Sequence, residues 1–178
     1  MTAVPVYHVR FTCAPDYMAR RLPFRPAHLA QLVGLRDDGH VIASGPEPDG
    51  GAAHIFYRVP ELAALNALLA DNVFYDAKLF VAHDARAFTD IVLPLATLPA
   101  DVGLKVTLVE GRVSDWARAS AALVTLQRQE RVGFGGRFAD GTALAVVRSP
   151  KGSEAIQWLT QAGAFTGAPI ARSWSQTL

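Results

Sequence analysis

The chain has 178 residues, of which 51% are hydrophobic, and its 17 basic residues nearly balance 16 acidic ones. This composition provides a hydrophobic core, which excludes a disordered chain, and it offers no basic face for a nucleic acid. A single cysteine, Cys13, excludes an internal disulfide framework and a multi-cysteine zinc site. Because neither an apolar run of about 20 residues nor a signal peptide is visible, we expect a soluble cytoplasmic protein without a membrane partner.

The first half of the sequence is predicted to run strand, helix, strand, strand, helix, strand. A β-rich run at residues 4–11 precedes a helical pattern of apolar residues, which begins near Pro26 and ends at Gly39. Short strands follow at residues 41–44 and 53–59, and the turn between them occupies residues 47–51. Pro60 begins a second helix, and a short bridge leads to a last strand at residues 78–89.

The second half repeats this order with an offset of 91 residues. A strand at residues 104–109 precedes a helix that either Ser114 or Asp115 could cap. Strands at residues 132–138 and 143–147, a helix beginning at Pro150 and a strand at residues 168–174 complete the pattern. We therefore predict two domains at residues 1–94 and 104–178, joined by a linker at residues 95–103.

A β-α-β-β-α-β unit of this length is typical of the ferredoxin-like fold, in which two helices cover one face of an antiparallel sheet with strand order 4-1-3-2. The uncovered faces of two fused copies can cover each other. The sequence therefore predicts an α+β fold of two tandem ferredoxin-like units, packed sheet to sheet as an α+β barrel within one chain. The interior of this barrel would be the ligand cavity, and exposed sheet edges also allow a homodimer.

Strand directions in the first unit bring polar residues from four segments to one rim. We expect a histidine and an aspartate there to be catalytic, because the carboxylate orients the imidazole that moves the proton. A serine, an arginine and a threonine would bind the substrate through hydrogen bonds or an anionic group. The alternative is a surface pair without chemistry. The catalytic residues are His28 and Asp71, and the substrate-binding residues are Ser44, Arg25 and Thr12.

Weaker candidates lie elsewhere in the chain. The predicted strands carry His8, His54 and His83, which could hold a metal ion if all three faced one side. The favoured alternative is that these strand histidines are half-exposed or hydrogen-bonded. Cys13 is interpreted as a packed side chain rather than a nucleophile. The glycine-rich residues 133–136 lie in a strand, so we interpret them as close backbone packing rather than a phosphate loop. We expect no metal and no cofactor.

The rim residues lie within a sequence that resembles a known family. Residues 21–46, RLPFRPAHLAQLVGLRDDGHVIASGP, resemble the signature of YCII-related proteins. Residues 71–80, DNVFYDAKLF, resemble that family's Asp-Pro-Tyr segment, with Asn72 in place of the proline. The resemblance spans residues 6–92 and implies the dimeric α+β barrel superfamily, with both halves supplied here by a diverged tandem fusion. It also implies an Asp–His dyad, which falls on Asp71 and His28.

Related members of this superfamily include a dehydrochlorinase of a hydroxylated chloroaromatic ring, muconolactone isomerase and cofactor-free monooxygenases. We therefore expect a cofactor-independent enzyme that performs proton transfer on a small cyclic or aromatic compound, by isomerisation, lactone chemistry or elimination. The alternative is a non-catalytic small-molecule-binding or assembly module with the same barrel. The second copy lacks the polar set, because the offset places alanine or glycine opposite His28, Ser44 and Asp71.

Overall fold

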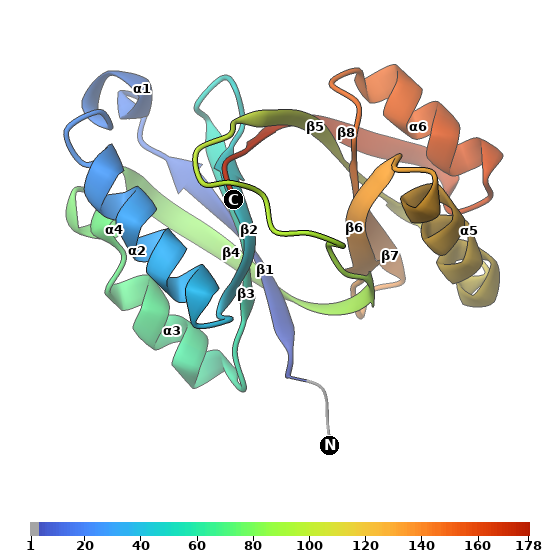
Figure 1. Ribbon diagram of the computed structural model, residues 1–178, viewed down its shortest axis with the longest axis horizontal. Coiled ribbons are helices and arrows are strands. Elements are labelled where there is room, and N and C mark those ends of the chain that lie inside the picture. The colour runs from blue at the N-terminus through green and yellow to red at the C-terminus, as the bar shows by residue number, and fades with distance from the viewer. Residues whose placement is uncertain (1–3) are drawn as a thin grey trace. The chain divides into compact units, whose positions relative to one another are not determined.

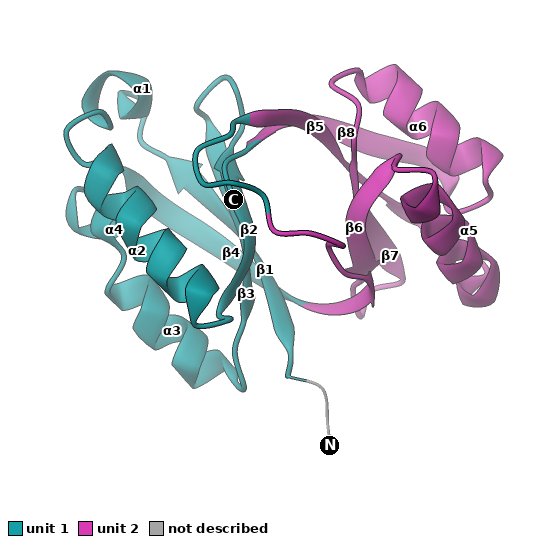
Figure 2. Cartoon of the chain, in the orientation of Figure 1, with its two compact units in different colours: residues 1–87, 98–103, 176–178 teal, residues 88–97, 104–175 magenta. Residues whose placement is uncertain are grey.

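The computed structural model describes residues 4–178, which divide into two compact units (Figure 2). Unit 1 contains the residues up to 87 together with residues 98–103 and 176–178, and unit 2 contains residues 88–97 and 104–175. Residues 88–94 and 176–178 therefore fall in the opposite unit from the one that the linear boundaries give them. No helix within residues 4–178 is long and apolar enough to cross a membrane.

Unit 1 has the predicted order of strands and main helices. Its strands follow the hydrogen-bonded order β2-β3-β1-β4, which is the 4-1-3-2 order of the ferredoxin-like fold. Figure 1 shows its longer helices on one face of these strands. Two helices of four residues each, α1 and α4, were not predicted. The elements are β1 (Val6–Cys13), α1 (Tyr17–Arg20), α2 (Arg25–Asp37), β2 (Val41–Pro46), β3 (Ala52–Arg58), α3 (Leu62–Ala70), α4 (Val73–Asp76) and β4 (Phe80–Val92).

Unit 2 contains the corresponding elements of the second half. Its own strands follow the order β6-β7-β5-β8, and the end of β4 pairs antiparallel with β6 through Thr89 and Arg137. The chain is thus a mixed α+β protein, with eight strands in residues 4–178, as the sequence predicts. The elements are β5 (Leu104–Arg112), α5 (Trp116–Arg128), β6 (Val132–Arg137), β7 (Thr142–Val147), α6 (Gly152–Gln161) and β8 (Thr166–Gln176).

The core of unit 1 lies between its helices and one face of its strands. In β1, Val9 and Phe11 alternate with polar residues, and they belong to the same buried cluster as Ile55 and Tyr57 of β3. Because successive side chains of a strand point to opposite faces, the polar residues between them rise from the other face. The C-terminal Leu178 is also buried in this cluster.

The first turn of α5 is closed by one of the two predicted caps. The Asp115 carboxylate accepts a hydrogen bond from the Arg118 backbone N–H at 3.0 Å. We expect Asp115→Ala to lower the free energy of unfolding by about 1 kcal/mol, because this N–H loses its partner. Ser114→Ala is the matched control and should change stability by much less. Chemical denaturation followed by circular dichroism measures both, and equal losses would contradict the assignment.

Candidate functional site

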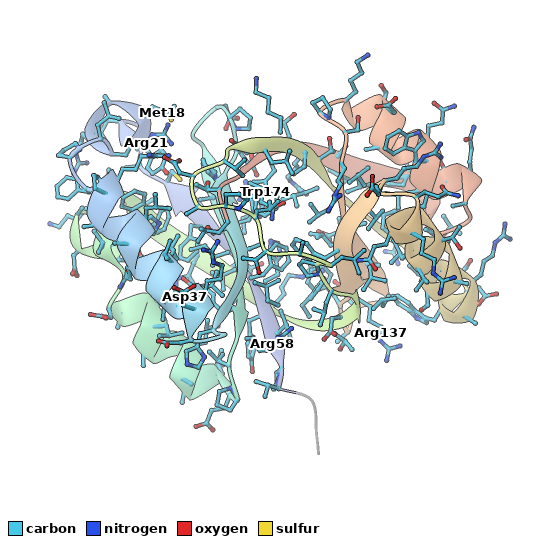
Figure 3. The ribbon with its side chains drawn as sticks, in the orientation of Figure 1. Met18, Arg21, Asp37, Arg58, Arg137 and Trp174 are labelled. Atoms are coloured by element: carbon cyan, nitrogen blue, oxygen red, sulfur yellow. The ribbon has the colours of Figure 1, made fainter. Side chains whose placement is uncertain are left out.

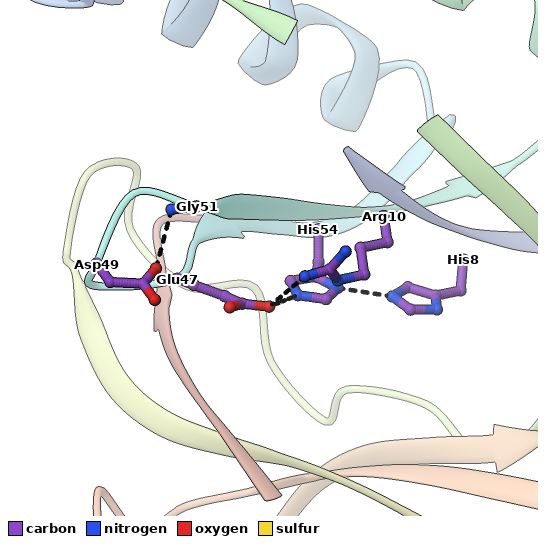
Figure 4. Close-up of polar contacts among 6 residues, drawn as sticks. All are labelled: His8, Arg10, Glu47, Asp49, Gly51 and His54. Carbon is purple, nitrogen blue, oxygen red and sulfur yellow. Dashed lines mark hydrogen bonds and ion pairs between the residues drawn. The ribbon is translucent and has the colours of Figure 1, made fainter. Parts of the chain in front are cut away.

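Four polar side chains of unit 1 form a connected network (Figure 4). His8 Nε2 lies 2.9 Å from His54 Nδ1, and His54 Nε2 lies 2.9 Å from Glu47 Oε1. The Arg10 guanidinium approaches the same Glu47 oxygen at 3.6 Å. We call His8, His54 and Glu47 the histidine relay. Its two imidazoles are buried, with 5% of His8 and 1% of His54 exposed.

The register of the strands explains why these residues meet. Arg10 of β1 stands opposite His54 of β3, and His8 of β1 stands opposite Phe56 of β3. Residues that stand opposite each other share a face of the sheet, so these four strand side chains lie on one face. Figure 4 shows His8, Arg10 and His54 pointing away from the helices. Diagonal neighbours across an antiparallel pair are close enough for long side chains to touch, and this geometry brings the two imidazoles together.

Glu47 reaches the relay from the turn between β2 and β3. The turn is held by the Glu47 N–H, which donates to the Ala52 carbonyl at 2.8 Å. It is also held by the Asp49 carboxylate, which accepts from the Gly51 N–H at 2.9 Å (Figure 4). These bonds fold the turn back over the beginning of β3, where the Glu47 side chain meets His54.

The charge on Glu47 assigns the protons of both imidazoles. An ionised carboxylate only accepts hydrogen bonds, so His54 donates to Glu47 through Nε2. The Nδ1 atom of neutral His54 then accepts, and His8 donates to it through Nε2. The His8 ring also stacks on Phe56, with 4.7 Å between ring centroids. The relay is therefore a fixed chain of hydrogen bonds along which a proton can be passed.

His28 lies on the other, helix-covered face of unit 1. Its ring stacks on Phe74 with 3.7 Å between centroids and meets the edge of Phe80 at 5.8 Å. Only 8% of the residue is exposed, and its Nδ1 atom has no hydrogen-bond partner within the described chain. Burial lowers the pKa of His28 from 6.5 to about 4, so the imidazole is neutral at neutral pH.

The predicted His28–Asp71 dyad is not joined by a direct contact. Both residues lie near the first turns of α2, because Gln31 donates a hydrogen bond to the Asp71 carbonyl and accepts one from the Val73 N–H at 3.2 Å. The Asp71 side chain is exposed while His28 is buried. Among residues 4–178, no hydrogen bond or ion pair links the Asp71 carboxylate to the His28 imidazole.

The three predicted substrate-binding residues occupy different environments. Thr12 is exposed in β1. Ser44 stands opposite the core residue Ile55 and is 1% exposed, and its hydroxyl has no hydrogen-bond partner within residues 4–178. Arg25, the first residue of α2, forms an ion pair with Asp101. Ser44 therefore shares the helix-covered face with His28, whereas Thr12 and Arg25 are accessible to solvent.

Two further candidates are not hydrogen-bonded to the relay within residues 4–178. His83 is hydrogen-bonded to the Tyr75 hydroxyl, so it does not join His8 and His54. Within residues 4–178, no group of three or more His, Cys, Asp or Glu side chains is arranged to hold a metal ion. Burial, followed by the charge of Glu47, raises the pKa of the Cys13 thiol to about 12, so at neutral pH the thiol is protonated and a weak nucleophile.

One more polar group lies beside Tyr17. Arg21, which follows α1 (Figure 3), places its guanidinium carbon 5.4 Å from the Tyr17 ring centroid, and Tyr17 in turn meets Phe74 edge-on at 5.8 Å. Sequence reasoning did not assign a role to Arg21, Glu47 or Arg10. The alternation of His8 and Arg10 with Val9 and Phe11 is a signal from which a polar sheet face could have been predicted.

Comparison with known proteins gives one sequence likeness and a broader structural one. No protein-family model matches the chain. It is 39% identical over 72 residues to Protein YciI of Escherichia coli O6:H1 and of Shigella flexneri, which is 38% of this chain and 72% of theirs. A solved structure from Lactobacillus acidophilus NCFM, described as a candidate monooxygenase, matches 98% of this chain and 95% of its own at 12% identity, with a TM-score of 0.62.

A second candidate monooxygenase, from Fusobacterium nucleatum, matches 100% of this chain and 94% of its own at 10% identity, with a TM-score of 0.64. At these identities the two structures establish likeness of fold.

Proposed function

This chain belongs to the YciI family, and on that premise we propose that it acts on a small organic molecule by cofactor-independent acid–base chemistry, of the isomerase, lactone or elimination type. The observation that carries the proposal is the histidine relay, with its two hydrogen bonds of 2.9 Å in series. A carboxylate that fixes the tautomer of an imidazole is a recurrent arrangement for proton transfer near neutral pH.

Each member of the relay has a distinct role in this scheme. His8 exchanges a proton with the substrate, and His54 passes the resulting positive charge along the chain of hydrogen bonds. Glu47 orients His54 and balances that charge, and the Arg10 guanidinium lies 3.6 Å from the same Glu47 oxygen. Phe56 stacks on the His8 ring and holds its orientation.

A second candidate for the proton-transfer group is the His28–Asp71 pair that the family resemblance implies. The observation that favours it is the pair of buried atoms without hydrogen-bond partners, His28 Nδ1 and Ser44 Oγ, on the same face of the sheet. A ligand between α2 and the strands would satisfy both atoms. In this version Asp71 turns inward when a ligand binds, and Ser44, Arg25 and Thr12 contact the substrate.

The likeness of the whole chain to two solved structures supports the proposal that the units are tandem ferredoxin-like copies forming an α+β barrel. We propose that the chain also forms a homodimer. We propose separately that its ligand is a small molecule. The alternative function is a binding module that keeps the fold without turnover.

Two matched variants decide among these possibilities. The screen uses hydroxylated aromatic compounds and lactones, and it follows deuterium incorporation and product formation by NMR. For an acid–base relay, His54→Asn should lower turnover by about 100-fold, because proton transfer by a positioned group contributes at least that much. His28→Asn should keep most of the rate. His40→Asn, which changes a half-buried histidine bonded to the Arg58 carbonyl, is the control.

A large loss with His28→Asn and none with His54→Asn would overturn the relay in favour of the second candidate. Ligand binding without turnover in the wild type would overturn the enzyme proposal and leave the binding module.

A further inference from the structure

The linker between the two halves supplies a carboxylate to the first helix of the predicted site. The two terminal guanidinium nitrogens of Arg25, Nη1 and Nη2, both donate to the Asp101 carboxylate. The distance from Nη1 to Oδ2 is 3.0 Å. This bidentate arrangement pairs two N–H groups of the planar guanidinium with the two oxygens of the carboxylate. Arg25 is thus shaped and charged to bind a carboxylate group.

The linker segment Leu98–Gly103, which belongs to unit 1, forms two further hydrogen bonds within that unit. The Leu98 carbonyl accepts from Arg36 Nη1 at 2.9 Å, and the Asp101 N–H donates to the Thr177 carbonyl at 2.9 Å. Val102 is 47% exposed, whereas Leu98 is partly buried. The side chains of Arg25 and Asp101 are 38% and 43% exposed, and an ion pair this accessible to water is weak.

The backbone of Asp101 lies in the left-handed region, with a φ angle of +63°, which aspartate adopts more readily than most residues other than glycine. A competing carboxylate from a ligand would displace the exposed Asp101 side chain by taking its place on the Arg25 guanidinium.

The position of Arg25 indicates where a carboxylate ligand would bind. Arg25 begins α2, and His28 follows three residues later, so both side chains lie on neighbouring positions of one helix face. The unpartnered and buried Nδ1 atom of His28 is an independent sign that a polar ligand group belongs near this turn. The positive end of the helix dipole adds to the attraction for an anion.

We propose that Arg25 is a binding site for the carboxylate of a small ligand, and that Asp101 of the linker occupies it as an internal surrogate that the ligand must displace. The site lies on α2, apart from the histidine relay, and the inference does not depend on the relay. It makes the linker a regulatory element, because ligand binding at Arg25 releases the segment Leu98–Gly103.

An NMR titration of the full chain with benzoate tests this inference. Asp101→Asn should tighten benzoate binding by up to about fivefold, because a weak internal competitor is removed. Arg25→Gln should abolish the shifts of the α2 amides. Benzamide, which has the same shape without the charge, should not bind in any variant. Asp16→Asn removes the exposed ion pair with Arg20 and is the control for a general change of surface charge.

Limited proteolysis provides a second readout that does not need turnover. Benzoate should increase cleavage within residues 98–103 of the wild type, as should Asp101→Asn without ligand. Benzoate shifts that persist in Arg25→Gln, or equal benzoate affinity in Asp101→Asn and the wild type, would overturn the proposal. Loss of the relay's activity would leave these outcomes unchanged, so the two proposals fail separately.

Discussion

Acidification from pH 7 to pH 4 should destabilise the protein by about 3 kcal/mol through His28 alone. Burial lowers the pKa of His28 to about 4 in the folded chain, whereas an imidazole in the unfolded chain titrates near 6.5. Between these two values the unfolded chain binds a proton that the folded chain does not. The free energy of unfolding therefore falls as the pH falls through this window, and the contribution is fully lost below about pH 4.

Urea denaturation at pH 7 and at pH 4.5 measures this contribution in the wild type and in His28→Phe. The phenylalanine keeps an aromatic ring against Phe74 but does not titrate, so the variant should lose much less stability on acidification. His83→Gln, which changes an exposed histidine, should retain the acid sensitivity of the wild type. If His28→Phe and the wild type lost the same stability, the ring of His28 would not be buried in solution as described.

The same burial shows which features of the candidate site can be predicted from the sequence and which cannot. Strand directions place His28 and Asp71 at one end of unit 1, and the bonds from Gln31 to the backbone at Asp71 and Val73 agree with this placement. What periodicity does not reveal is the depth of a side chain. Phe74, 46 residues further along the chain, stacks on His28 and removes it from water, and it does so from α4, a helix too short to leave a periodic pattern.

The histidine relay also combines features that the sequence predicts with features that it does not. The alternation of polar and apolar residues in β1 indicates that His8 and Arg10 share a face, and composition alone identifies the turn at residues 47–51. The contact of Glu47 with His54 depends on how that turn folds back over β3. The amino-acid sequence of this five-residue turn does not determine the direction of its first side chain, that of Glu47. The carboxylate of the relay was therefore not predicted. Register, rather than propensity, creates this site.

Gly136→Ala should lower the free energy of unfolding by about 3 kcal/mol, the largest loss that we expect from a single methyl group in this chain. A Cβ atom at this position would lie 2.3 Å from the Thr89 carbonyl oxygen and 2.6 Å from the Phe88 ring. Gly136 pairs with Asp90 in the antiparallel ladder between β4 and β6, so the collision involves backbone that cannot rotate away. The end of β4 would have to separate from β6.

Gly133→Ala is the matched control in the same strand. Its Cβ atom would lie 3.7 Å from the nearest neighbour, the Val146 carbonyl oxygen, which is an ordinary contact. Because alanine restricts the unfolded chain more than glycine does, this variant should be neutral or stabilised by up to about 1 kcal/mol. Urea denaturation gives both values, and amide hydrogen exchange at residues 88–92 should accelerate in Gly136→Ala alone. Equal stabilities of the two variants would show that β4 approaches β6 less closely than the glycine requires.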